Sequence, residues 1–321
     1  MQINENEILK ALTYLKLIKN NFHTQTFQIS PQDAAAILER NNTKNRPLNL
    51  RRCLTIAESI KRGEWQFNGD IIRFGKSGQL LDGQHRLKAI VLAEKTVKSL
   101  ACFNLEDEVF HTIDVDAKAR TASDVLAMEN YTHYTLVTSA LRTIMMFDYS
   151  GLFRPTNQEA KPSATQILQF ARQHDKQFLE EIARMADRRR NVNKFIGTTF
   201  HTAFYYLLTY RINPAYQKKD IAFLREQFLD KLEKGSNLEF ENPILQLREK
   251  LISFKSEKYK SVHEEIAFSY FIKAFHLYAN SLTVKNLRIS NFNPETARKI
   301  YQTVFAPKRE SFISLLESHQ K

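Results

Sequence analysis

The spacing of hydrophobic positions divides the chain into a mixed part and a helical part. Up to about residue 120, short apolar runs alternate with amphipathic stretches, as where the strand-like Thr26–Ile29 leads into a helical pattern that ends near Arg40. From Thr121 onward apolar residues recur at three- and four-residue spacing and strand signals cease. The pattern predicts an α+β protein in which a small mixed αβ domain precedes a larger all-α domain.

The borders of the predicted elements carry recognisable signals. Ser30-Pro31-Gln32-Asp33 offers a capping residue, a proline suited to the first helical position and an acid that favours the helix dipole. Gly75-Lys76-Ser77-Gly78 reads as a hairpin turn. It is not the end of a Walker A loop, because Asp70 stands where that motif requires glycine and no helix follows directly. In this part we predict helices at 5–22, 31–40, 50–62 and 83–93, and strands at 26–29, 70–74, 79–81, 97–103 and 110–114.

The chain is expected to have three parts. Residues 1–24 hold an N-terminal helix, 25–125 the mixed domain and 126–321 the helical domain. In the helical part, breaks rich in glycine, asparagine and proline separate the predicted helices. These helices are 121–148, 163–187, 193–211, 219–234, 243–254, 261–280 and 294–305.

One stretch combines a strand, a glycine and a polar helix start: Leu80-Leu81-Asp82-Gly83-Gln84-His85-Arg86-Leu87. The first N–H groups of a helix lack internal partners and carry the positive end of its dipole, which favours anions. Gly83 lets the backbone approach a ligand, and Asp82 stands where it could cap the helix or hold a metal ion. Arg86 suits phosphate, and His85 lies away from the apolar face. The stretch predicts a phosphate site.

The order Asp82-Gly83-Gln84-His85-Arg86 after a small strand pair resembles the signature of the ParB/sulfiredoxin-like superfamily, most closely its DGQHR branch of phage- or defence-type proteins. The resemblance covers about residues 27–125. It implies that the strand-to-helix junction binds the phosphates of a nucleoside triphosphate, ATP or CTP. It also implies catalytic roles for Asp82, His85 and Arg86, cofactor contacts from Gly83 and Gln84, and Mg²⁺ at Asp82.

The chain departs from several branches of that superfamily. Sulfiredoxin has a cysteine where this chain has Gln84, so thiol repair is excluded. Partition proteins carry an arginine where His85 stands and a following helix-turn-helix domain, which cannot be named in this chain. Free-serine kinases depend on an acid early in the domain, and residues 44–49 contain none.

Other residues are predicted to complete the phosphate site. A loop at 114–120 brings together acids and cations, the composition of a site that handles phosphate and metal, although a solvated loop with incidental ion pairs explains it equally well. Arg46, near the start of the mixed domain, is a candidate to reach the phosphates. The cofactor-binding residues expected outside the motif are Arg46, Asp114, Lys118, Arg120 and Thr121.

The composition of the chain restricts the kinds of partner and the cellular setting that we expect for it. The 321 residues carry 47 Lys and Arg against 35 Asp and Glu, a net charge of +12 that favours nucleic acid such as DNA, nucleotides or an anionic membrane surface. The apolar run 204–208 is far shorter than the ~20 residues of a membrane span. A polar N-terminus without signal-peptide character, and Cys53 and Cys102 far apart in sequence, favour a reducing, cytoplasmic setting. The oligomeric state stays open.

Three functions are compatible with these features. The preferred one is nucleoside-triphosphate binding with hydrolysis or phosphoryl transfer linked to DNA or a nucleotide substrate, which needs mainly positioning and charge stabilisation. The alternatives are a non-catalytic DNA-binding or regulatory module and, ranked lower, a ParB-like nuclease. The run Arg188-Arg189-Arg190 is interpreted as a solvated helix end in preference to a nucleic-acid contact, and Trp65 as a packing residue in preference to a base-stacking one.

Overall fold

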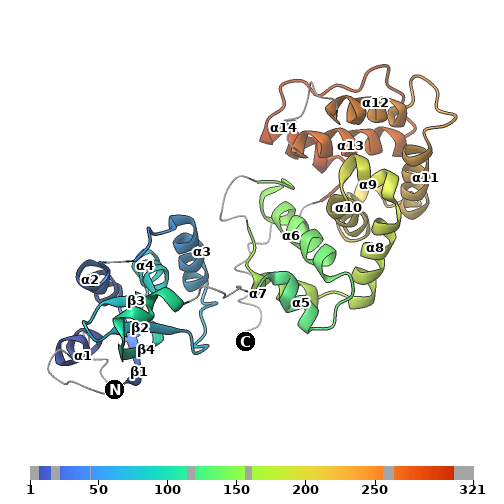
Figure 1. Cartoon of the computed structure of the whole chain (residues 1–321). Coiled ribbons are helices and arrows are strands. Elements are labelled where there is room, and N and C mark those ends of the chain that lie inside the picture. The colour runs from blue at the N-terminus through green and yellow to red at the C-terminus, as the bar shows by residue number, and fades with distance from the viewer. Residues whose placement is uncertain are drawn as a thin grey trace. The chain divides into compact units, whose positions relative to one another are not determined.

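The computed structural model consists of two compact units, unit 1 (Met1–Ala119) and unit 2 (Arg120–Lys321) (Figure 1). Unit 1 holds all the strands found in the described residues together with four helices, and unit 2 is helical, which confirms the α+β class. The N-terminal helix belongs to unit 1, and unit 2 begins a few residues before the predicted boundary at 125. The structure describes residues 7–15, 22–43, 45–113, 120–155, 161–255 and 264–306.

Unit 1 is built on a four-stranded mixed sheet with the strand order β1-β4-β2-β3. The central strand β4 pairs antiparallel with β1 and parallel with β2, while β3 forms the antiparallel hairpin with β2. Helix α4 packs between α2 and α3 (Figure 1). The elements are α1 (Glu7–Leu15), β1 (His23–Ile29), α2 (Pro31–Asn41), α3 (Leu50–Lys61), β2 (Ile71–Gly75), β3 (Leu80–Asp82), α4 (Gln84–Ala93), β4 (Val97–Leu105) and the 3₁₀ helix η1 (Asp107–Thr112).

Local signals account for several of these borders. Ser30 and Asp33 form a reciprocal capping box at the start of α2, as predicted. The Gly75–Gly78 segment is the β2–β3 turn, and the Ser77 hydroxyl donates to Asp107 Oδ1 at 2.8 Å. The predicted strand at 110–114 is wrong in its described part, because residues 107–112 form η1.

The core of unit 1 is aromatic at its centre. The rings of Phe74 and Phe103 stack with centroids 5.2 Å apart, and Phe27 meets Phe103 edge-on at 5.8 Å. Leu87 and Ile90 bring the apolar face of α4 onto this cluster. Burial of that face fixes α4 on the sheet and thereby fixes the position of its N-terminus.

Unit 2 consists of helices and one described 3₁₀ turn. Two helices predicted as continuous, 121–148 and 163–187, each break in two. His133 adopts a left-handed backbone (φ 47°) before α6, and the Asp175 side chain caps α8 by accepting from Gln177 N–H. The elements are α5 (Ala122–Met128), α6 (Tyr134–Ser150), α7 (Ala164–Arg172), α8 (Lys176–Arg188), α9 (Arg190–Ile196), α10 (Thr198–Tyr210), η3 (Pro214–Tyr216), α11 (Ile221–Lys234), α12 (Pro243–Lys255), α13 (Glu264–Ala279) and α14 (Pro294–Gln302).

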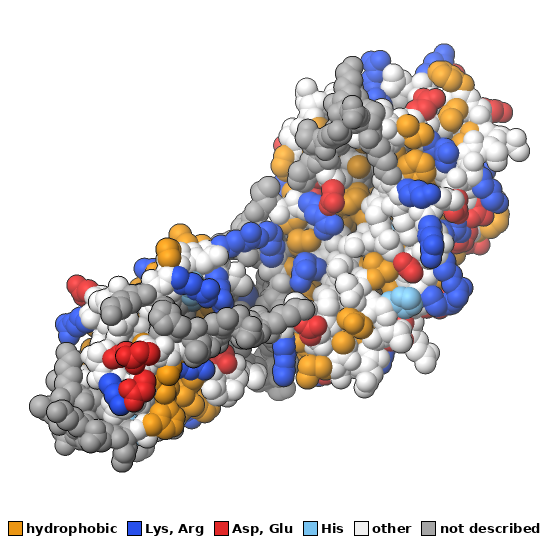
Figure 2. Space-filling view, in the orientation of Figure 1, with side chains coloured by type: hydrophobic (Ala, Val, Ile, Leu, Met, Phe, Trp, Pro, Cys, Tyr) orange, Lys and Arg blue, Asp and Glu red, His pale blue; other side chains and the backbone are white. Residues whose placement is uncertain are grey.

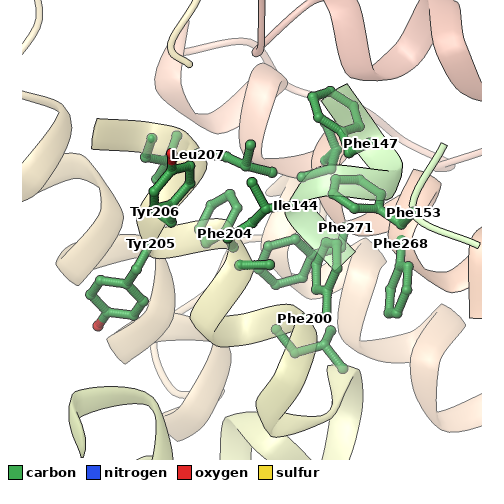
Figure 3. Close-up of a cluster of buried hydrophobic side chains, with 14 of the residues drawn as sticks. Ile144, Phe147, Phe153, Phe200, Phe204, Tyr205, Tyr206, Leu207, Phe268 and Phe271 are labelled. Carbon is green, nitrogen blue, oxygen red and sulfur yellow. The ribbon is translucent and has the colours of Figure 1, made fainter. Parts of the chain in front are cut away.

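Helix α10 runs through the core of unit 2 and is buried from Phe200 to Leu208 (Figure 3). Phe200 stacks on Phe268 with centroids 3.9 Å apart, and Phe204 meets Phe271 edge-on at 5.0 Å. Aromatic pairs in these geometries add to the stabilisation that burial alone gives. Unit 2 therefore has an extensive core of its own.

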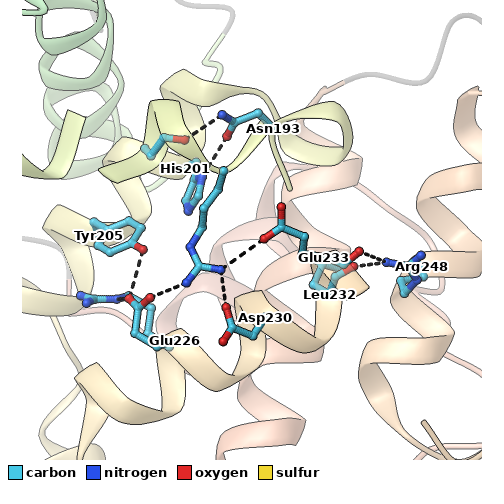
Figure 4. A network of polar contacts seen from close by, with 11 residues as sticks. Asn193, His201, Tyr205, Glu226, Asp230, Leu232, Glu233 and Arg248 are labelled. Carbon is cyan, nitrogen blue, oxygen red and sulfur yellow. Dashed lines mark hydrogen bonds and ion pairs between the residues drawn. The ribbon is translucent and has the colours of Figure 1, made fainter. Parts of the chain in front are cut away.

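A polar network links α9 and α10 to α11 (Figure 4). The Arg189 guanidinium lies 2.6 Å from carboxylate oxygens of both Glu226 and Asp230, and its side chain is only 19% exposed. The interpretation of Arg188–Arg190 as a solvated helix end is wrong at Arg189, which faces α11. Among the described residues no helix is long and apolar enough to cross a membrane.

Candidate anion-binding site

The helix α4 starts directly at the end of β3, and Gly83 forms the junction. Gly83 has φ 109° and ψ 0°, a backbone conformation that favours glycine. A Cβ at this position would lie 3.1 Å from two carbons of the Ile72 side chain. The prediction that Asp82 caps the helix is wrong: Gly83 is the N-cap residue and supplies no side-chain hydrogen bond. The backbone at the start of α4 is therefore free of a capping side chain.

Asp82 is held between two arginines. Its Oδ2 accepts hydrogen bonds from Arg73 Nη1 at 2.5 Å and from Arg86 Nη2 at 2.8 Å. Arg86 also donates to the Ile71 carbonyl at 2.8 Å. These contacts connect β2, β3 and α4. Asp82 and Arg86 are therefore bonded to groups of the protein itself. A divalent cation at Asp82 would face two neighbouring positive charges, which argues against this carboxylate as a Mg²⁺ ligand.

Gln84 is buried and faces the segment that joins α2 to α3. Its Nε2 donates to the Arg46 carbonyl at 2.9 Å, and its Oε1 accepts from Asn42 Nδ2 at 3.3 Å. Both ends of the amide are thus engaged within the protein. A direct ligand contact, as the motif suggests for Gln84, has no support in this arrangement.

His85 joins the starts of two helices. Its Nε2 accepts a hydrogen bond from the Asn49 backbone N–H at 3.0 Å, and the Asn49 side chain caps α3 by accepting from Arg52 N–H at 3.0 Å. Burial lowers the pKa of His85, and the nearby Arg52 and Arg46 lower it further, against a smaller opposite effect of Asp82. The imidazole is consequently held neutral in a positive environment.

Exposed arginines lie near His85 and on the adjoining first turn of α3. Arg46, Arg51 and Arg52 are exposed, and none of the three forms an ion pair with any residue that the structure describes. Lys88, half-buried on α4, adds to the positive charge between α3 and α4. Figure 2 shows Lys and Arg side chains gathered on this part of unit 1. We call the surface formed by Arg46, Arg52 and His85, with the first turns of α3 and α4, the anion surface.

The remaining predicted site residues fall elsewhere. Asp114 and Lys118 lie outside the described residues, and Arg120 and Thr121 belong to unit 2. The Thr121 hydroxyl caps α5 in a reciprocal box with Asp124, so it has a structural role of its own. Within the part of the chain that is described, no three His, Cys, Asp or Glu side chains gather as a metal site.

Sequence reasoning missed two features of the anion surface. Nothing local to Arg52 distinguishes it from other charged positions on a helix surface. Asn49 does carry a signal, because an asparagine directly before a helix predicted at 50–62 is a capping residue. Trp65 is half-buried, packs on the unit 1 core and donates to the Lys98 carbonyl at 3.3 Å, in agreement with the packing interpretation.

The structure thus brings Arg46 and His85 of the predicted set together, adds Arg52, and engages Asp82, Gln84 and Arg86 in internal contacts. Compared with known proteins, the chain matches no protein-family model, no curated protein and no solved structure.

Proposed function

We propose that unit 1 binds a nucleoside triphosphate, ATP or CTP, through its phosphate groups at the anion surface. The observation that carries the proposal is that Arg46 and Arg52 are exposed, lack ion-pair partners among the described residues, and both act electrostatically on His85. The starts of α3 and α4 meet at the same side chain. The resemblance of residues 82–86 to the ParB/sulfiredoxin-like signature supports a nucleotide as the source of the phosphates.

Each part of the surface has a defined task in this proposal. The two guanidinium groups supply paired N–H donors that match phosphate oxygens. Gly83 adds no capping side chain at the start of α4, so no side chain competes with an anion for the first backbone N–H groups of that helix. The Asp82–Arg86 pair keeps the junction in shape. Asp82 and Arg86 are bonded to each other, so neither is unpaired and ready to act on a phosphate. The site therefore supports nucleotide binding, and hydrolysis or phosphoryl transfer is a separate activity to be measured.

The test is the affinity for ATP, CTP and inorganic triphosphate, measured by calorimetry on the full chain. Arg46→Ala and Arg52→Ala should each weaken binding by about tenfold or more, since a hydrogen bond to a charged group contributes ~1.5–3 kcal/mol. Lys10→Ala is the control, because it removes an exposed cation from α1. Failure of the wild type to bind any of the three ligands, or equal affinities in all variants, would contradict the proposal.

A second candidate is DNA binding by the same surface. Arg51 is exposed next to Arg52, and the chain carries a net charge of +12, both of which suit a longer polyanion. Arg51→Ala separates the two candidates. It should weaken binding of a duplex oligonucleotide and leave triphosphate affinity unchanged if both ligands bind here. A duplex that binds without displacing the triphosphate would place DNA elsewhere.

A further inference from the structure

The segment 42–49 carries Arg46 to the anion surface without forming a helix or strand in its described residues. Side-chain amides attach it to the body of unit 1. Asn45 Nδ2 donates to the Leu80 carbonyl and to Asn42 Oδ1, both at 2.7 Å. Just before the segment, Asn41 Nδ2 donates to the Gly78 carbonyl at 2.7 Å. These bonds connect the segment to β3 and to the turn that precedes it.

Gln84 completes this amide network from the first turn of α4. It is 5% exposed, and it bonds two different parts of the segment, the Arg46 carbonyl and the Asn42 side chain. The bond to the Arg46 carbonyl fixes the backbone from which the Arg46 side chain extends. No other described hydrogen bond holds the backbone of Arg46.

We propose that Gln84 is a positioning residue. It touches no ligand and holds segment 42–49 so that the Arg46 side chain takes its place in the anion surface. This inference rests on the proposed phosphate binding. Its physical basis is preorganisation: a segment already held in its binding geometry loses less conformational entropy when the ligand arrives. The bonding of both ends of the amide explains why glutamine suits this position, since one end must donate and the other must accept.

The deciding experiment is a double-mutant cycle of Gln84→Met and Arg46→Ala, with inorganic triphosphate as the probe. Methionine keeps the length of the side chain and removes the donor and the acceptor. Gln84→Met should weaken binding by about tenfold in the wild-type background and by less than about twofold when Arg46→Ala is already present. Equal losses in both backgrounds would overturn the proposal, because Gln84 would then act on the ligand without Arg46.

Hydrogen exchange of the Asn49 amide, which donates to His85 Nε2 at the end of the segment, gives an independent readout that needs no ligand. The exchange should be faster in Gln84→Met, while the fluorescence of Trp65 shows that unit 1 stays folded. Unchanged exchange would overturn the positioning role. If the wild type binds no triphosphate, the proposed function fails, and the exchange data still decide whether Gln84 holds the segment. Asn42→Ala removes the bonds of Asn42 to Gln84 and Asn45 and keeps the bond of Gln84 to the Arg46 carbonyl, so it should speed exchange less; this variant covers the case in which Gln84→Met does not fold.

Discussion

The backbone N–H of Asn49 donates a hydrogen bond to Nε2 of His85, with 3.0 Å between the two nitrogens. The acceptor is the imidazole lone pair, so the bond exists only while Nε2 is unprotonated. Burial, Arg52 and Arg46 lower the pKa of His85 and keep it in this state. The starts of α3 and α4 are therefore connected by a group that can ionise within an accessible pH range.

Triphosphate binding should take up protons at His85. A bound anion offsets the charges of Arg52 and Arg46, so the pKa of His85 rises on binding. Affinity should therefore increase as the pH falls from about 7.5 to about 5.5, by up to about tenfold for each unit by which that pKa rises. Calorimetry in buffers of different ionisation enthalpy measures the proton uptake. His85→Gln should reduce this uptake to what the ligand itself contributes, and equal uptake in both proteins would exclude His85.

Asp82→Asn should destabilise unit 1. The substitution leaves Arg73 and Arg86 half-buried without their shared carboxylate, at a cost of about 1–3 kcal/mol in the free energy of unfolding. Trp65 is the single tryptophan of the chain, so its fluorescence during urea titration follows unit 1. Glu39→Gln, at an exposed position of α2, removes the same charge and should have little effect. Loss of ligand binding without loss of stability would instead indicate that Asp82 acts on the ligand.

The stability of unit 2 should depend on pH through His201. This side chain is fully buried, and burial, with smaller effects of Arg189 and Arg225, lowers its pKa to about 3. Its Nδ1 hydrogen-bonds to Asn193 Oδ1, while Nε2 has no partner among the described residues. Because the unfolded chain accepts the proton first, the free energy of unfolding should fall as the pH drops from about 6.5 toward 3, by up to about 1.4 kcal/mol per pH unit.

The variant His201→Gln isolates this contribution. Urea titrations followed by far-ultraviolet circular dichroism at several pH values should give a shallower pH dependence for the variant than for the wild type. An identical dependence in the two proteins would show that folding does not lower the pKa of His201.

Phe204→Ala should be among the most damaging core substitutions in unit 2. Phe204 is fully buried and meets Phe271 and Phe275 edge-on. Removing the ring should cost about 3–5 kcal/mol, since lost transfer free energy and the remaining cavity add. Phe223→Ala is the matched control: Phe223 is 56% exposed, and its loss should change the free energy of unfolding by less than about 0.5 kcal/mol. Similar costs at the two positions would contradict the packing described for α10.

Local chemistry made part of the fold predictable. The capping box of Ser30 and Asp33 needs only neighbouring residues, and it forms as expected. The break before α6 contains Asn130 and His133, both with left-handed backbone. Asparagine and histidine favour that conformation only weakly, so the hydrophobic pattern of 121–148 outweighs them in a prediction from sequence. Gly83, and not Asp82, is the N-cap residue of α4. It has a positive φ and packs closely on the Ile72 side chain.

The sequence motif predicts where the candidate site lies in the chain. It does not predict which residues its side chains contact. Residues 82–86 indicate a strand-to-helix junction, and the structure has one there. The partners of Gln84, however, lie about forty residues earlier in the chain, and nothing in the motif specifies them. Arg52 becomes part of the surface only because α3 packs on α4. Tertiary contacts therefore decide which residues of the motif remain available to a ligand.

The amide network around Gln84 contains no ionisable group, and this has a consequence for solution measurements. Its hydrogen bonds join neutral donors to neutral acceptors, so added salt should weaken these bonds little. Added salt screens the attraction between exposed arginines and an anion. The decline of affinity with salt concentration should therefore report mainly the number of charges in contact with the anion, because the bonds that hold Arg46 in place carry no charge themselves.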